Sequence, residues 1–189
     1  MNQKLFSKDF ILVIIGQIIS LFGNATIRFA LPLYLLNQTG SSVIYGNVTA
    51  CAFIPAILLS PVGGILADRV NKRNVMVILD FFTAISIFVF SLIFLHVNLI
   101  LVLTVMLMLL YSIAGIYQPS VQASIPALVS QSNYMAANSI VNVINSFATL
   151  IGPIFGGILY STYGLECVLW VCMVCFVLSY EVIFCRFTI

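Results

Sequence analysis

Residues 64–73 read GILADRVNKR, where an apolar stretch ends in small residues and meets one acid and three bases. This is the densest group of charges in a chain that is 62% hydrophobic and only 6% charged. A soluble protein carries a charge on about a quarter of its residues. The pattern is typical of a membrane helix that exits into a short cytoplasmic loop, so the chain is predicted to be a membrane protein.

Six apolar segments follow one another along the chain, each long enough to cross a hydrocarbon layer of roughly 30 Å as a helix. Polar or turn residues separate them, and no soluble domain is left over. The predicted fold is therefore all-α, a polytopic membrane protein with six transmembrane helices. The predicted spans are 10–36, 43–67, 75–95, 99–119, 134–160 and 166–186, and the loop 120–133 separates the fourth from the fifth.

The lysines and arginines of the loops predict the orientation, because short cytoplasmic loops carry an excess of them. If the N-terminus is inside, the bases of the loops and termini are all cytoplasmic and the outer loops have none. Both termini are therefore expected in the cytoplasm and the chain in the plasma membrane. The cytoplasmic bases are Lys4, Lys8, Arg69, Lys72, Arg73 and Arg186.

The string Gly-Gly-Ile-Leu occurs twice, from Gly63 near the inner end of the second span and from Gly156 near the outer end of the fifth. The two copies lie about half the chain apart. They predict two inverted three-helix repeats, about 9–96 and 97–189, an arrangement typical of transporters that places a substrate site between the repeats. A chance match of a short apolar string is the alternative.

Polar residues inside the spans mark the faces that avoid lipid, because such residues are costly in a bilayer. The first, fourth and fifth spans each carry polar residues at helical spacing, on one face. These faces either line a water-filled cavity or bond to one another without any ligand. The residues expected to line a substrate cavity are Gln17, Asn24, Arg28, Tyr111, Gln118, Asn142 and Asn145.

Charged residues within the spans are few. Arg28 is the only base well inside one, where it would attract an anionic or carbonyl-bearing substrate group or pair with an acid. The alternative is that its side chain extends to the outer headgroups. Asp68 and Asp80 lie near the inner ends of the second and third spans, within reach of the loop bases. No acid is therefore expected at the midplane to carry a proton.

Small residues in the fifth span recur at a spacing of four, at Ala148, Gly152 and Gly156, and Pro153 invites a kink beside them. Small residues let membrane helices approach closely. The spacing predicts a tight seam with another span, a hinge that controls access to the cavity, or both.

The sequence supports neither an enzyme nor a nucleic-acid-binding protein. It has one histidine, a net charge of +2 and no zinc-peptidase, nucleophile-elbow or phosphate-loop motif. Its five cysteines lie in apolar segments without disulfide or zinc spacing. No metal and no cofactor are expected.

Two motifs resemble those of the major facilitator superfamily. The loop 2–3 signature is matched, with Asn71 in place of its second glycine, by Gly64, Leu66, Ala67, Asp68, Arg69, Lys72 and Arg73. The span 5 antiporter motif is matched, with Ala148 and Ser139 where glycines are usual, by Gly152, Pro153, Gly156 and Gly157. Segments 117–119, 123–129 and 137–139 resemble the macrolide-efflux-like branch.

The resemblance implies the N-terminal six-helix half of a twelve-span transporter, without its C-terminal half. It implies that Asp68 stabilises the outward-facing state by meeting a helix terminus of the other half. The expected partners are a small-molecule substrate, the lipid bilayer, and the missing half or a second copy of the chain. The expected conformational switch comprises Gly64, Asp68, Arg69, Lys72, Arg73 and Asp80.

The function that follows is secondary active transport by alternating access, as proton-coupled efflux of small amphipathic compounds or drugs. The lack of an expected midplane acid favours neutral or weakly anionic substrates over cationic drugs. Two alternatives stay open at this point: an uptake carrier on the same scaffold, and a non-transporting fragment or assembly partner.

Overall fold

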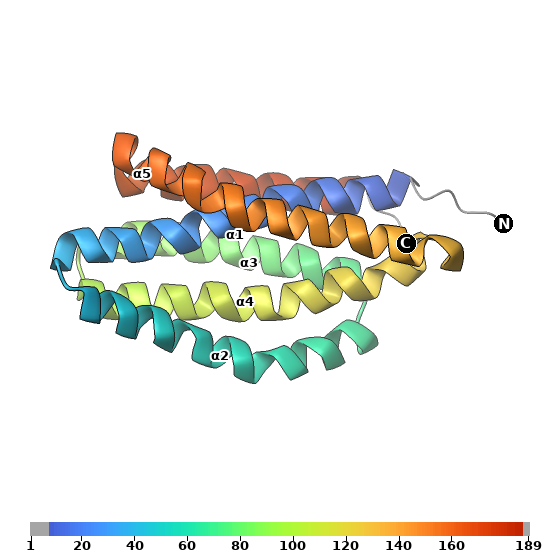
Figure 1. Cartoon of the computed structure of the whole chain (residues 1–189), viewed down its shortest axis with the longest axis horizontal. Coiled ribbons are helices and arrows are strands. Elements are labelled where there is room, and N and C mark those ends of the chain that lie inside the picture. The colour runs from blue at the N-terminus through green and yellow to red at the C-terminus, as the bar shows by residue number, and fades with distance from the viewer. Residues whose placement is uncertain (1–7, 187–189) are drawn as a thin grey trace.

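The structure, a computed structural model, describes residues 8–186, without the side chains of residues 8, 9, 66–69 and 184–186. Within this part the chain forms a bundle of α-helices with one short 3-10 helix and no strand (Figure 1). The elements are α1 (Lys8–Thr39), α2 (Ser42–Arg69), α3 (Lys72–Ile93), α4 (Leu99–Leu128), η1 (Gln131–Asn133) and α5 (Tyr134–Arg186).

All five α-helices are long and apolar enough to cross a membrane. Their outer faces carry large apolar side chains that remain exposed, such as Ile57 at 71%, Leu150 at 67% and Ile154 at 63%. A water-soluble protein rarely exposes apolar surface on this scale, whereas lipid tails solvate it. The prediction of an all-α, multi-pass membrane protein is confirmed.

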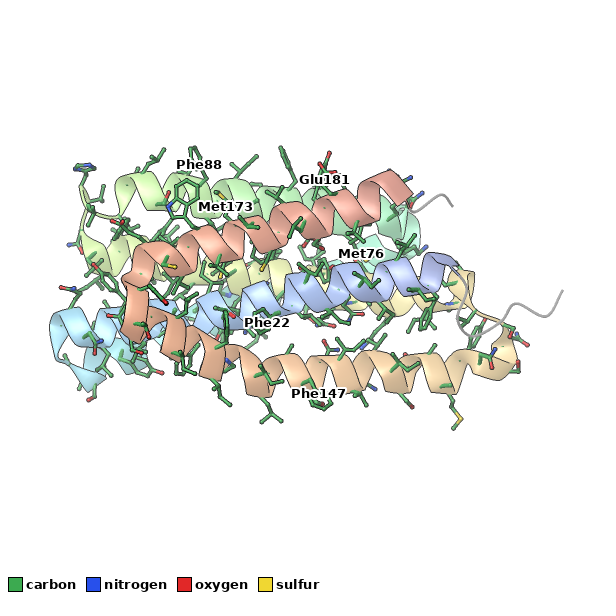
Figure 2. All side chains as sticks on the ribbon, turned by 90° about the horizontal axis from the view of Figure 1, so that it is seen from above. Phe22, Met76, Phe88, Phe147, Met173 and Glu181 are labelled. Carbon is green, nitrogen blue, oxygen red and sulfur yellow. The ribbon has the colours of Figure 1, made fainter. Side chains whose placement is uncertain are left out.

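The helix α5 contains a sharp break. It is 53 residues long, and at Gly164 its backbone leaves the helical region with φ 78° and ψ 179°. Glycine adopts a positive φ without the steric cost that a Cβ imposes. The two arms, 134–163 and 165–186, fold back toward the same end of the bundle, and α1 runs between them (Figure 2). The arms correspond to the predicted fifth and sixth spans.

The helix α4 extends further than the sequence predicts. We expected a loop over 120–133, but α4 continues through Pro119 and Pro126 to Leu128, so that prediction is wrong. The reason is tertiary packing. Val121, Ile125 and Leu128 are buried in one apolar cluster with side chains of α1, α3 and α5, and neighbouring helices let membrane helices tolerate proline.

Successive helices run in opposite directions (Figure 1). The α1–α2 turn and the α3–α4 connection lie at one end of the bundle, while the start of α1 and the end of α5 lie at the other. Asparagines fix two of the helix starts. The Oδ1 atom of Asn71 accepts a hydrogen bond from the backbone N of Arg73 at 3.0 Å, and that of Asn98 accepts one from Ile100 at 3.1 Å.

Two apolar clusters fill the interior, one including Ile27, Leu103 and Phe176 and the other including Met76 and Ile183. Buried polar side chains lie between the two clusters along the helices. We call this group the polar layer; it comprises Gln17, Ser20 and Asn24 of α1, Asp80 and Thr83 of α3, and Ser179 of α5. The two clusters therefore hold a set of polar groups inside an otherwise apolar bundle.

Candidate substrate cavity and ion site

A cavity of about 390 Å³ opens at the polar layer, between α1, α3, α4 and the two arms of α5. Small-molecule sites in proteins typically measure roughly 300–1,000 Å³. The apolar part of the wall includes Leu21, Ile113 and Phe176. The polar part consists of Ser20, Asn24, Arg28, Asp80, Thr83, Tyr117, Gln118, Gln122, Asn145 and Thr149.

The structure brings together four of the seven side chains that the sequence predicts for the cavity: Asn24, Arg28, Gln118 and Asn145. The other three lie elsewhere. Gln17 is fully buried one turn before Ser20 and does not line the space, while Tyr111 lines a neighbouring cavity. Asn142 is exposed and lies one turn before Asn145, where the cavity does not extend.

Gln118 of α4 and Asn145 of α5 form a reciprocal amide pair in the cavity wall. The Gln118 Nε2 donates to Asn145 Oδ1 at 2.9 Å, and the Asn145 Nδ2 donates to Gln118 Oε1 at 3.4 Å. Each amide still has one donor and one acceptor position unused by this pair. The pair therefore joins two helices and can also bind a polar ligand.

Arg28 lies where the main cavity meets a second one. Its guanidinium carbon is 3.5 Å from the centre of the Tyr111 ring, a cation–π contact. The second cavity, of about 310 Å³, shares Ala25, Arg28 and Thr149 with the first. Phe53 packs edge-on against the same Tyr111 ring at 4.4 Å between centroids. The Tyr111 ring thus holds the Arg28 guanidinium in the wall of both cavities, and Phe53 supports that ring.

Asp80 was expected to reach the loop bases from within the third span, but its hydrogen bonds run to serines instead. Its side chain is 1% exposed, and it lines the cavity. The Ser20 hydroxyl donates to its Oδ1 at 2.7 Å, and the Ser179 Oγ lies 2.6 Å from its Oδ2. The error arose from counting turns along α3 alone, because the partners of Asp80 come from α1 and α5, which are distant in sequence.

Sequence reasoning also missed Tyr117 and Ser179, which face Asp80 from other helices. The signal that could have found the site was present in Asp80 itself, because an acid inside an apolar span marks a functional position by default. Several other buried polar atoms have no hydrogen-bond partner among the described residues. They are both amide atoms of Gln17, Asn24 Oδ1, Thr26 Oγ1 and the Tyr117 hydroxyl.

The loop 2–3 segment is only partly described. The backbone of Asp68 and Arg69 forms the last turn of α2, but their side chains lie outside the described residues. Lys72 and Arg73 begin α3 with half-buried side chains. A Cβ on Gly64 would meet nothing within 4 Å, whereas one on the preceding glycine, Gly63, would lie 2.9 Å from the carbonyl oxygen of Gly115.

The small residues of the first α5 arm pack directly on α1. A Cβ on Gly156 would lie 2.8 Å from the backbone oxygen of Thr26, and one on Gly152 would overlap the Cβ of Ala25. Gly157 is less crowded, with the Phe29 ring at 3.3 Å. Ala148 lines the main cavity and Pro153 the second one. The tight seam predicted for this span is therefore present, directly beside both cavities.

Curated relatives of the chain include efflux proteins. A macrolide efflux protein of Streptococcus pyogenes is 23% identical over 82% of this chain and 38% of its own length. A multidrug efflux pump of Mycolicibacterium fortuitum is 21% identical over 85% of this chain and 41% of its own. The chain thus spans about four tenths of the length of these relatives.

A solved structure shares the fold. A bacterial homologue of the iron transporter ferroportin, in its outward-facing state, superposes with a TM-score of 0.69 over 92% of this chain and 48% of that one, at 23% identity. The family model described as Major Facilitator Superfamily matches residues 13–188. Since that match covers nearly the whole bundle and its cavity, the chain belongs to the major facilitator superfamily.

Proposed function

We propose that this chain forms half of a secondary active transporter that exports small amphipathic compounds by alternating access, driven by a proton gradient. The observation that carries the proposal is the 390 Å³ cavity with polar walls inside an apolar membrane bundle. A bundle needing only stability gains nothing from a buried amide oxygen without a partner, such as Asn24 Oδ1 in the cavity wall. A substrate that enters the bilayer needs such groups.

The wall favours neutral or weakly anionic substrates. Both carboxylate oxygens of Asp80 are engaged by serine hydroxyls, whereas Arg28 offers its charge to the space of both cavities. Apolar side chains such as Ile113 and Phe176 suit the apolar part of an amphipathic molecule. The names of the relatives, macrolide efflux and multidrug efflux, agree with the export of amphipathic compounds.

The helix contacts support six spans in two inverted repeats, 9–96 and 97–189. In that scheme α2 corresponds to the first arm of α5, and α4 corresponds to α1. The contacts follow this relation, because Gly63 of α2 packs on Gly115 of α4 while Gly156 of α5 packs on Thr26 of α1. Repeats of this kind move against each other during transport.

The proposed working unit adds a second six-helix half, or a second copy of this chain, that closes the open side of the cavities. The chain covers 38–41% of two efflux relatives, which supports a working unit that contains a second half. In the proposed orientation both termini and the α2–α3 loop are cytoplasmic and the membrane is the plasma membrane. Oligomeric mass in detergent distinguishes the two kinds of partner.

The direct test is transport of a radiolabelled macrolide into everted membrane vesicles that contain the complete transporter. We expect accumulation that requires an acidic interior and collapses with a protonophore. Asn145→Ala removes one amide of the cavity wall and should slow accumulation roughly tenfold, since each 1.4 kcal/mol of lost binding is about tenfold. Ser146→Ala changes an exposed neighbour bonded only within its own helix and should behave as wild type.

Accumulation in right-side-out vesicles instead would favour the alternative, an uptake carrier on the same scaffold. Equal rates for the two alanine variants would remove the cavity from the mechanism.

Asp68→Asn should slow transport while leaving membrane insertion intact. The family resemblance assigns this carboxylate to a contact with a helix terminus of the other half. A carboxylate at a helix N-terminus contributes about 0.3–1 kcal/mol, enough to bias two states without locking one of them. Transport rates of matched vesicles, normalised to transporter content, measure the effect. Unchanged rates would contradict the proposed contact.

A further inference from the structure

Asp80 is the centre of a buried group of oxygen atoms from four helices. The Ser20 Oγ of α1 lies 2.7 Å from Asp80 Oδ1, and the Ser179 Oγ of α5 lies 2.6 Å from Oδ2. The same Ser179 Oγ lies 2.9 Å from the carbonyl oxygen of Gly16. The Tyr117 hydroxyl of α4 is buried and faces Ser20, Ser179 and Asp80, but it meets the full hydrogen-bond geometry with none of them.

If Asp80 is ionised, this group has fewer hydroxyl hydrogens than short oxygen–oxygen contacts that need one. Ser179 has one hydroxyl hydrogen, but its oxygen is at hydrogen-bond distance from two acceptors, Asp80 Oδ2 and the Gly16 carbonyl. One of these two short contacts would then lack a hydrogen. A proton on Asp80 Oδ2 resolves this, because the carboxylic acid donates to Ser179 Oγ, Ser179 donates to Gly16, and Ser20 donates to Oδ1.

The charges around Asp80 point the same way. Arg28 of α1 lines the same cavity but lies eight residues beyond Ser20, about 12 Å along the helix, with its guanidinium on the Tyr111 ring. The helix α4 faces Asp80 with the phenol of Tyr117, and α5 faces it with the hydroxyl of Ser179. The nearest acid on that arm, Glu181, is exposed. A buried carboxylate without a bonded base is costly to ionise.

We infer that Asp80 carries the transported proton, bound at Oδ2 in the conformation described here and released to the cavity in another. Release transfers the proton to solvent that enters the cavity which Asp80 lines. The Ser179 hydroxyl then donates its hydrogen bond to Asp80 Oδ2 instead of the Gly16 carbonyl. The ionised carboxylate can also accept a hydrogen bond from the Tyr117 hydroxyl. Proton loss would therefore weaken the α1–α5 link at Gly16 and strengthen a link between α3 and α4. The protonation of Asp80 follows from its contacts alone, whereas the transport of that proton rests on the proposed function.

The test is infrared difference spectroscopy of the complete transporter between acidic and alkaline pH. We expect a carbonyl stretching band of a protonated carboxylic acid that Asp80→Asn removes and Glu181→Gln leaves. Ser20→Ala deletes the hydrogen bond to Oδ1 and should shift the band to higher frequency. Asp80→Asn should still fold, since its amide can donate to Ser179 and accept from Ser20 as the protonated acid does.

A second measurement follows proton release when substrate binds, with a pH dye in weakly buffered detergent solution. Wild type and Glu181→Gln should release protons, and Asp80→Asn should bind substrate without release. The inference is overturned if no band is lost in Asp80→Asn, or if the carboxylate signal responds to Na⁺ and not to pH, which would make it a sodium site. Because the band is read without transport, failed export would contradict the proposed function alone.

Discussion

Gly156→Ala is expected to destabilise the purified transporter and to reduce its transport activity. The added methyl group would lie 2.8 Å from the Thr26 backbone oxygen and 3.3 Å from the Thr26 Cα, so α1 and the first α5 arm would have to separate. A backbone cannot rotate away as a long side chain can. Overpacking of this kind costs about 1–3 kcal/mol. Thermal unfolding in detergent, followed through the single tryptophan or by circular dichroism, measures the loss.

Gly46→Ala is the matched control for this substitution. Gly46 also lies within a helix, but a Cβ there would meet nothing within 4 Å. Alanine favours a helix over glycine by roughly 0.5–1 kcal/mol, so the control should keep or raise the melting temperature. The melting temperature is thus expected to fall in Gly156→Ala and to stay the same or rise in Gly46→Ala. A Gly156→Ala protein as stable as the Gly46→Ala protein would show that the seam can open without cost.

Arg28→Ala should weaken transport of anionic substrates by roughly ten- to a hundredfold. A hydrogen bond to a charged group contributes about 1.5–3 kcal/mol, and each 1.4 kcal/mol is about tenfold in affinity. Arg28 presents its charge where the two cavities meet. Arg28→Lys keeps the charge but loses the planar stacking on Tyr111, so it should recover only part of the rate.

The comparison of two substrates serves as the control for Arg28. A weakly anionic compound and its neutral ester, each measured by initial rate against concentration in the same vesicles, separate charge recognition from general damage. The KM for the anion should rise in Arg28→Ala while the neutral ester changes little. Equal losses for both compounds would mean that Arg28 supports the packing of Tyr111 and does not select substrates.

Much of the fold could be predicted from the sequence because the bilayer imposes simple rules. Apolar runs long enough to cross it must be helices, and all the predicted spans coincide with helical segments. The boundary at Pro119 failed because burial of Val121 and Ile125 against other helices outweighs the break that proline favours. The sequence pattern of α4 alone does not show that its C-terminal end packs against other helices.

The candidate site divides in the same way. Helical spacing grouped Asn24 with Arg28, and both line the cavity, since residues on one face of one helix share a wall. It could not find the group around Asp80, whose two serines are 60 and 99 residues away from it in the chain. Such contacts depend on how helices pack. Hence the sequence identifies which residues are polar within the membrane but not which of them meet.

The break at Gly164 has a consequence for how the protein is made. A single non-helical residue joins the two arms of α5, so the arms form a helical hairpin with almost no loop. In the proposed six-span arrangement this short link favours insertion of the two arms as one hairpin. Because α1 lies between them (Figure 2), that hairpin packs on both sides of a helix synthesised more than a hundred residues earlier. The packing of α1 is therefore completed only when the last part of the chain has been made.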